Sequence, residues 1–227
     1  MITDTEHFLS SWQQTLPSHT PYLHYVIKDI FKPDLLSQIQ TLPFKAYDLA
    51  YKAGRREEFN SLRQYLNPEV IQAHDCAHRV AAIFLAAPVV SFIEQAGQTY
   101  LRDSFLRIEY TLDKEKFWLE PHTDIGEKYF TMVVYLSNDE DSHGWGTDIY
   151  TDATTYHSTV PYEENSALVF FPSERSWHGF RPRPINGIRR TLIINYVTQA
   201  WRSRHELVHP SNTIAKNEMT ARKIQGG

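Results

Sequence analysis

The feature that most constrains the fold is a change in hydrophobic period near residue 101 of this 227-residue chain. Before it, from residue 4 onwards, apolar side chains mostly recur at the spacing of amphipathic helices, as in residues 33–39, 68–86 and 89–98. After it, apolar and polar residues alternate, and β-branched and aromatic residues become frequent, which is typical of strands. One early strand is also expected, within residues 22–31. The chain is thus predicted to have a mostly helical first part and a β second part.

The second part contains eight short runs with strand character and no helix between them. They span residues 105–111, 117–122, 129–137, 148–150, 154–159, 167–171, 177–180 and 191–197. Short strands joined by turns favour packed antiparallel sheets over a parallel α/β sheet. We therefore expect a mainly β (α+β) fold, a double-stranded β-helix or jelly roll with an N-terminal helical buttress. We expect one domain over residues 1–200, with the buttress in 1–101 and the jelly-roll core in 102–200, followed by a polar C-terminal tail in 201–227.

Charge and cysteine content exclude several classes of function. The chain has 23 basic and 27 acidic side chains, a net charge of −4, which argues against nucleic acid or an anionic membrane as the main partner. Cys76 is the one cysteine, so an internal disulfide and a thiolate metal cage are excluded. No apolar run approaches 18 residues, and the N-terminus lacks the pattern of a signal peptide. We expect a soluble, cytoplasmic protein.

The candidate metal ligands begin with the His122-Thr123-Asp124 motif at the end of a predicted strand. The pair alone is weak evidence, because a chain with 11 histidines contains this spacing by chance. His178 lies on a much later predicted strand, and strands far apart in sequence can meet across the interior of a barrel. Two histidines and one carboxylate form the facial triad of non-haem Fe(II) enzymes. The three residues together therefore indicate a metal site.

The last predicted strand carries a candidate site for an anion. Strand alternation places Arg189 and Thr191 on one face and Arg190 on the other. A guanidinium that faces a barrel interior needs an anionic partner, and its fork fits a carboxylate. Tyr135, on another predicted strand, has a hydroxyl that can reach the same carboxylate.

The order of these motifs resembles that of the Fe(II)/2-oxoglutarate-dependent dioxygenases, particularly their prolyl-hydroxylase-like branch. The shared features are His-x-Asp, a strand that ends in Tyr-Leu-Ser, a distal histidine and an Arg-x-Thr strand, over about residues 105–197. The resemblance implies Fe(II) bound by His122, Asp124 and His178. It implies the cosubstrate 2-oxoglutarate beside Arg189, Thr191, Tyr135 and Tyr110. Arg190 is the alternative cosubstrate arginine.

The implied reaction is the O2-dependent oxidation, most simply the hydroxylation, of an unidentified small molecule or peptide, with release of succinate and CO2. The halogenases of the family have a small residue in place of Asp124, so the intact carboxylate favours hydroxylation. The resemblance implies no catalytic residue beyond the metal ligands, and a homodimer is common in the family. Further contacts to the substrate or to the ligands are expected from Asn195, Thr131, Trp118 and Arg107.

Three alternatives stay open at this stage. A cupin-like metalloenzyme would not use 2-oxoglutarate, and Arg189 and Thr191 would have no task in it. A non-catalytic module would bind 2-oxoglutarate or metal without turnover. A nucleobase demethylase is a weaker alternative, because that branch has a second arginine where this chain has Asn195. Elsewhere, His74 and His78 have the spacing of a zinc-protease helix, but the catalytic glutamate is missing, and we expect ordinary polar contacts from them.

Overall fold

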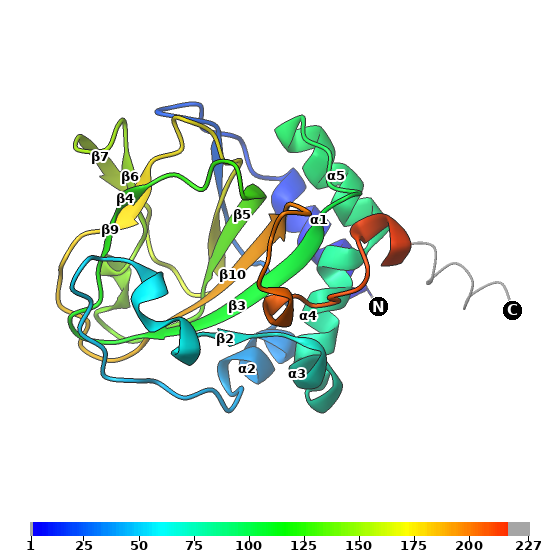
Figure 1. Ribbon diagram of the computed structural model, residues 1–227, viewed down its shortest axis with the longest axis horizontal. Coiled ribbons are helices and arrows are strands. Elements are labelled where there is room, and N and C mark those ends of the chain that lie inside the picture. The colour runs from blue at the N-terminus through cyan, green and yellow to red at the C-terminus, as the bar shows by residue number, and fades with distance from the viewer. Residues whose placement is uncertain (1, 218–227) are drawn as a thin grey trace, which may run out of the picture.

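The structure, a computed structural model, describes residues 2–217 and has three layers: helices, a long sheet and a shorter sheet (Figure 1). The helices cover one face of the long sheet, and the short sheet covers its other face. The α-helices are α1 (Asp4–Gln13), α2 (Pro33–Gln40), α3 (Pro68–Ala73), α4 (Asp75–Leu85) and α5 (Ala87–Gly97). Short 3-10 helices are η1 (Arg56–Leu62), η2 (Ser142–Gly144) and η3 (Arg204–Glu206).

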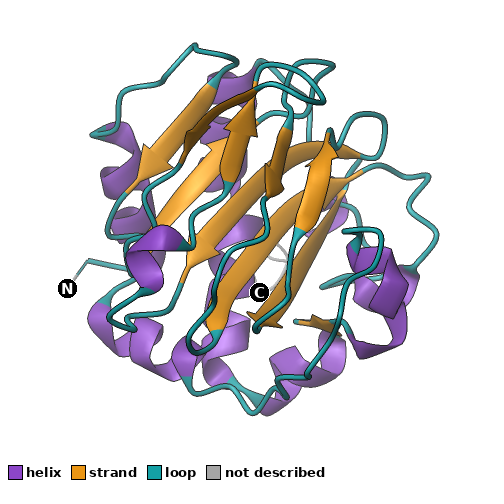
Figure 2. Ribbon diagram, turned by 90° about the vertical axis from the view of Figure 1, so that its left-hand side faces the viewer, coloured by secondary structure: helices purple, strands orange, loops and turns teal. Residues whose placement is uncertain are grey.

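The two sheets are antiparallel throughout the described residues. The strands are β1 (His24–Ile27), β2 (Gln64–Tyr65), β3 (Phe105–Asp113), β4 (Leu119–His122), β5 (Lys128–Tyr135), β6 (Asp148–Tyr150), β7 (Tyr156–Thr159), β8 (Ser166–Phe170), β9 (His178–Phe180) and β10 (Arg189–Val197). The long sheet has the order β1-β8-β5-β10-β3-β2, and the short sheet has the order β4-β9-β6-β7. Seen from the side of the short sheet, the two sheets lie one in front of the other (Figure 2). The predicted mainly β jelly roll with a helical buttress is confirmed.

The predicted elements agree with the structure except at one helix. Each of the eight predicted strands overlaps one of β3 to β10, and the early strand is β1. The single helix expected over 68–86 is wrong: it is two helices, α3 and α4, because the backbone of His74 is extended (φ −132°, ψ 116°). No proline or glycine marks this break, so sequence pattern had no signal for it.

The buttress helices bind the long sheet through residues one helical turn apart. In α1, Thr3 and Glu6 form a capping box, and Phe8 and Trp12 on the same face are buried. In α2, Leu35 and Ile39 occupy the equivalent positions. These side chains join one apolar cluster with the outward-facing residues of the long sheet, such as Ile108, Met132 and Ile194. The outer face of the long sheet is thereby covered, which leaves its inner face to form the site.

Residues 201–217, expected to form part of a polar C-terminal tail, pack against the rest of the structure. Leu207, Val208 and Ile214 are fully buried, and the backbone N–H of Val208 donates to the carbonyl of Leu106 on β3. Leu207 and Val208 are adjacent and five residues separate them from Ile214, so the stretch has no apolar period and its polar composition concealed the packing. The rest of the predicted tail, residues 218–227, lies outside the described residues.

None of the described helices is by itself long and apolar enough to cross a membrane. As a pair joined by a 53° bend, α4 and α5 meet the criteria of length and composition.

Candidate metal centre

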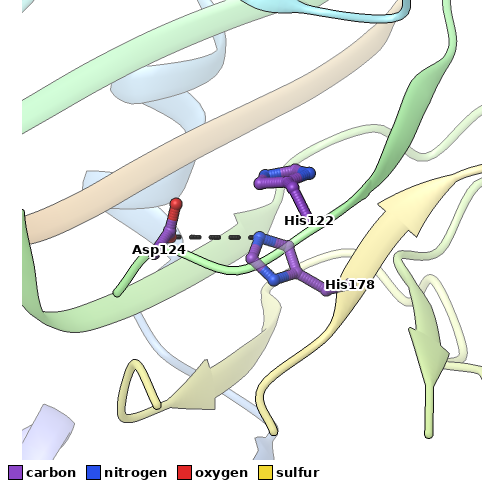
Figure 3. A group of neighbouring side chains, drawn as sticks. All are labelled: His122, Asp124 and His178. Atoms are coloured by element: carbon purple, nitrogen blue, oxygen red, sulfur yellow. Dashed lines mark ion pairs between the residues drawn. The ribbon is translucent and has the colours of Figure 1, made fainter. Parts of the chain in front are cut away.

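Three potential metal ligands meet where the short sheet faces the long one. His122 ends β4 and His178 begins β9, and the two residues are register partners in this antiparallel pair. Asp124 follows two residues after His122, in the turn that leads to β5. One ligand atom from each of the three side chains lies within 4.8 Å of the others (Figure 3). The pairing of an early strand with a late one thus assembles the predicted triad.

Both imidazole rings are held with the same nitrogen free. The Nδ1 atom of His122 lies 2.8 Å from the carbonyl oxygen of Glu120, and that of His178 lies 3.0 Å from the carbonyl oxygen of Ser176. A carbonyl oxygen only accepts, so each contact places the ring proton on Nδ1 and leaves the Nε2 lone pair available. This is the usual arrangement of metal-binding histidines, whose second nitrogen donates to an outer partner.

The electrostatics of the triad favour the protonation states that bind metal. Burial, with a further effect of His122, lowers the pKa of His178 to about 3, so its ring is neutral at physiological pH. Burial opposes ionisation of Asp124, but Lys128 and the two histidines outweigh it and hold the pKa of Asp124 below its ordinary value. His178 is therefore a neutral imidazole beside an ionised Asp124, the states in which these two side chains bind a divalent metal.

The carboxylate of Asp124 is oriented by two donors from β5. The ammonium of Lys128 donates to Oδ1 at 2.8 Å, and the hydroxyl of Thr131 donates to Oδ2 at 2.9 Å. A chain of hydrogen bonds continues inward: Asn195 donates to Thr131 Oγ1 at 3.1 Å, and Arg107 donates to Asn195 Oδ1 at 3.1 Å. Thr131, Asn195 and Arg107, expected near the ligands, therefore connect Asp124 to the buried interior.

The donor set and its surroundings fit Fe(II). Two imidazoles and a carboxylate bring one ligand atom each within 4.8 Å of the others, and Asp124 Oδ2 lies 3.9 Å from His178 Nε2. Three protein ligands on one side leave coordination positions for exogenous groups, as in the facial triad. All three side chains also line the same cavity, of about 430 Å³, so a ligand in this cavity can reach them.

The cavity extends from the triad to Arg189, the first residue of β10, and Thr191 also lines it. The Nε atom of Arg189 donates to the carbonyl oxygen of Trp145 at 2.7 Å, and Nη1 donates to Asp113 Oδ2 at 2.8 Å. Within residues 2–217, the Nη2 atom of Arg189 has no hydrogen-bond partner. Arg189 thus offers unused donors to the cavity that also contains the triad.

Tyr135 and Thr191 are on the inner face of the long sheet, but each bonds to a threonine. The hydroxyl of Tyr135 donates to Thr147 Oγ1 at 3.0 Å, and Thr147 itself lines the cavity. The hydroxyl of Thr191 lies 2.6 Å from that of Thr111 on the neighbouring β3. Tyr135 does not itself line the cavity, contrary to the expectation that it contacts the cosubstrate; it orients Thr147, and its ring stacks on Tyr162 with centres 4.5 Å apart.

Tyr110, Trp118 and Arg190 are not among the residues that line the cavity. Tyr110 faces the helices, and its hydroxyl donates to the carbonyl of Ile39, so the expectation that it contacts the cosubstrate was wrong. Alternation along β3 explains this placement, because Tyr110 lies between two inward-facing residues. Trp118 donates its indole N–H to the carbonyl of Tyr51 and supports a neighbouring segment. Arg190 lies on the strand face opposite Arg189, as predicted.

His74 and His78 do not share a helix, since His74 lies at the break between α3 and α4. They belong to no cluster of three metal-binding side chains within the part of the chain that the structure describes. The expectation of a helical pair was therefore wrong.

Two groups of buried charges lie at the inner face of β3; Arg107 and Arg189 were predicted site residues, but their charged partners were not. We name the first the balanced cluster: it has two arginines and two carboxylates, Arg63, Arg107, Glu109 and Glu206. We name the second the surplus cluster: it has two arginines and one carboxylate, Arg56, Asp113 and Arg189. Alternation from Arg107 to Asp113 on β3 was a usable signal for the carboxylates, whereas nothing local pointed to Arg56 or Arg63.

Comparisons with known proteins identify the fold. No family model matches the chain, and no curated protein matches it. A prolyl-4-hydroxylase from Pseudomonas putida matches with a TM-score of 0.56 and 14% identity over 85% of this chain and 93% of that chain. A prolyl hydroxylase from Trichoplax adhaerens, in complex with a hypoxia inducible factor peptide fragment, has a TM-score of 0.56 and 10% identity over 86% and 89% of the two chains.

A third solved structure is the viral collagen prolyl hydroxylase from Paramecium Bursaria Chlorella virus-1, as a complex with 2OG. Its TM-score is 0.53 with 11% identity, over 77% of this chain and 96% of that chain. At these identities the likeness establishes a shared jelly-roll fold over most of each chain. The chemistry has to be argued from the side chains of the cavity.

Proposed function

We propose that this protein is an Fe(II)- and 2-oxoglutarate-dependent oxygenase of the prolyl-hydroxylase-like branch, acting as a hydroxylase. One observation carries the proposal: a triad with free Nε2 atoms and a buried arginine with unused donors line one cavity. The metal would be held by His122, Asp124 and His178. The shared fold with prolyl hydroxylases supports this choice over other metal chemistry.

Iron and 2-oxoglutarate, when bound, supply the oxidising chemistry, in which the cosubstrate becomes succinate and CO2 and one oxygen atom of O2 enters the substrate. The chain supplies position and exclusion of water. Arg189 would hold the distal carboxylate of 2-oxoglutarate, and Thr191 and Thr147 line the path to the triad. Phe180, Val133 and other apolar side chains that line the cavity would limit the access of water to this path.

The residues around the triad contribute to this function by fixing its geometry. Asp124 would be kept in one orientation by Thr131 and Lys128, which would reduce the reorganisation needed on metal binding. The neutral His178 would need to lose no proton at physiological pH. No side chain is required to act as a general acid or base in this scheme.

The substrate we propose is a small molecule or a peptide. The Trichoplax neighbour holds a peptide fragment, and a cavity of about 430 Å³ leaves space for a substrate group beside a five-carbon cosubstrate. Location in the cytoplasm, a homodimeric state and the absence of a nucleic-acid partner stay predictions from the sequence.

The test is the conversion of 2-oxoglutarate to succinate by the purified protein with Fe(II) and O2, with and without candidate substrates. We expect slow succinate formation without substrate and none after chelation of the metal. A protein that binds metal and catalyses a reaction with no requirement for 2-oxoglutarate would be a cupin-like enzyme instead. Tight binding of 2-oxoglutarate with no succinate across a broad substrate screen would favour the non-catalytic module.

A further inference from the structure

The segment of residues 51–63, which we name the wall segment, connects the helical half of the chain to the cavity. It precedes β2, and Gly54, Arg55, Arg56 and Arg63 from it line the cavity. Gly54 has a positive φ of 64°, and a Cβ atom there would lie 2.5 Å from the ring of Trp118. The segment is therefore closely applied to β4, and the carbonyl of Gly54 accepts from the N–H of Glu120 at 2.9 Å.

Arg56 of the wall segment shares one carboxylate with Arg189. Its Nη1 and Nη2 atoms donate to Oδ1 and Oδ2 of Asp113, each at 2.9 Å, as a bidentate pair. Arg189 donates to the same Oδ2 atom at 2.8 Å. Two guanidiniums from opposite halves of the chain therefore meet at one oxygen atom.

Aromatic packing places both guanidiniums on the same wall. The guanidinium carbon of Arg56 lies 4.6 Å from the ring centre of Phe117, and that of Arg189 lies 4.8 Å from the ring centre of Phe180. The two phenylalanine rings are themselves in contact, with centres 5.3 Å apart. Both arginines line the cavity, and in the described residues neither Nε of Arg56 nor Nη2 of Arg189 has a hydrogen-bond partner.

The surplus cluster lacks one negative charge. Arg56 and Arg189 bring two positive charges, and Asp113 returns one. The three side chains are at most 12% exposed, so solvent compensates the excess charge poorly. The neighbouring balanced cluster has no such deficit, since Arg63 and Arg107 face Glu109 and Glu206. A carboxylate in the cavity beside Arg189 would complete the surplus cluster.

We propose that Arg56 is a second binding residue for the distal carboxylate of 2-oxoglutarate, and that Asp113 is the positioning residue that holds both arginines toward it. The inference rests on the proposed function and adds a cosubstrate contact from outside the jelly roll. It also makes the cosubstrate site incomplete until the wall segment is in place, because Arg56 reaches the site only through that segment.

A direct binding experiment separates this role from a purely structural ion pair. The dissociation constant of 2-oxoglutarate is measured by calorimetry with the Mn(II)-loaded protein under anaerobic conditions, which prevents turnover. Arg56→Met should raise this constant roughly tenfold to a hundredfold, since it removes a hydrogen bond between charged groups. The matched control is Arg63→Met, which removes a similarly buried arginine of the same segment from the balanced cluster. Its dissociation constant should stay within about twofold of wild type.

A second ligand tests which end of the cosubstrate Arg56 contacts. 2-Oxopentanoate has the same chain length but no distal carboxylate, so Arg56→Met should leave its affinity unchanged. If Arg56→Met does not fold, Arg56→Lys carries the test, because it keeps the charge and loses the fork; it should raise the dissociation constant of 2-oxoglutarate severalfold.

Each outcome assigns the failure to one proposal. If wild-type protein binds Mn(II) but no 2-oxoglutarate, the proposed function itself is wrong. If wild type binds 2-oxoglutarate and Arg56→Met binds it equally well, only the role of Arg56 is wrong. Equal weakening by Arg56→Met and Arg63→Met, or equal weakening for both ligands, would reduce the Arg56–Asp113 pair to a structural one.

Discussion

The two charge clusters on the inner face of β3 both consist of arginines and carboxylates, but they differ in net charge. In the balanced cluster, Glu109 accepts hydrogen bonds from Arg63 and Arg107, and Glu206 accepts a further one from Arg107. In the surplus cluster, Asp113 is the one carboxylate, and it accepts hydrogen bonds from both Arg56 and Arg189. Both clusters line or adjoin the same cavity, and within residues 2–217 only the surplus cluster has one more arginine than carboxylates.

This difference in net charge gives the two clusters different roles: the balanced cluster stabilises the fold, and the surplus cluster is suited to bind a ligand. A buried ion cluster whose charges cancel and whose donors are occupied fixes the structure around it. The ring planes of Tyr65 and Trp201 also pack against Arg107, with centres 4.8 and 5.2 Å from its guanidinium carbon, which further confines it. A cluster with an excess of one positive charge and free N–H groups is instead suited to bind an anion.

The largest effect is expected from removing the central arginine of the balanced cluster. Arg107→Ala leaves Glu109 and Glu206 buried with one cation between them, so the free energy of unfolding should fall by about 3–5 kcal/mol. Chemical denaturation at pH 7 measures this. The control is Lys28→Met, which removes an exposed pair with Glu163 and should cost no more than about 1 kcal/mol. Equal losses in the two variants would contradict the assigned role of the balanced cluster.

Removing Arg189 from the surplus cluster should weaken ligand binding more than it destabilises the fold. Arg189→Ala is expected to weaken 2-oxoglutarate binding by about 2–5 kcal/mol, because it deletes a buried charge-assisted contact. Arg190→Ala is the matched control, since this neighbouring side chain lies on the opposite face of β10 and does not line the cavity. The 2-oxoglutarate concentration for half-maximal succinate formation reports both. A stronger effect of Arg190→Ala would place the cosubstrate site on the opposite face of β10 and contradict the assignment of Arg189.

A smaller effect, on metal affinity, should distinguish residues that support the triad from residues elsewhere in the cavity. Thr131→Val removes the hydroxyl that donates to Asp124 Oδ2 while it keeps the shape of the side chain. We expect Mn(II) affinity to fall about tenfold, as for other outer partners of metal ligands. Thr147→Val, which alters the cavity near Tyr135 instead, should leave Mn(II) affinity unchanged. The idea fails if the two valine variants bind Mn(II) alike.

The smallest effect is a change in the acid sensitivity of folding. Burial opposes ionisation of Glu109, but Arg63 and Arg107 outweigh it and lower its pKa below the ordinary value of 4.5. A carboxylate whose pKa is lowered in the folded state contributes stability above its unfolded pKa and loses it as pH falls. The free energy of unfolding should therefore decrease as pH falls below about 4.5, and less steeply in Glu109→Gln. Denaturation curves at several pH values that decline in parallel for both proteins would rule this out.

Most of the fold and the metal triad could be predicted because their signals are local. Strand alternation identified β3 to β10, and the same rule placed Arg189 and Thr191 inside and Arg190 outside. The triad emerged from residue types and order, with His122 and His178 on strands that pair. Such signals survive because side-chain period and strand pairing follow directly from backbone geometry.

The rest depended on contacts between segments far apart in the chain. Arg56 and Asp113 are separated by 57 residues, and Arg63 and Glu109 by 46, so neither pair has a local pattern. The wall segment is held by these ion pairs together with hydrogen bonds to Trp118 and Glu120, and it carries no periodic apolar face. Tyr110 was misplaced for a different reason: the resemblance suggested its role, although its position between Glu109 and Thr111 already set it on the outer face.

The proposal that Fe(II) at the triad and 2-oxoglutarate bind together in one site is tested most directly by an anaerobic titration of the Fe(II)-loaded protein with 2-oxoglutarate, followed by visible absorption. We predict a weak charge-transfer band that saturates with 2-oxoglutarate in wild type and is absent in His178→Ala. This band requires metal and cosubstrate in contact at one site, so it reports the triad and the Arg189 side of the cavity together. A wild-type protein that binds both ligands without the band, or a band that persists in His178→Ala, would contradict the account.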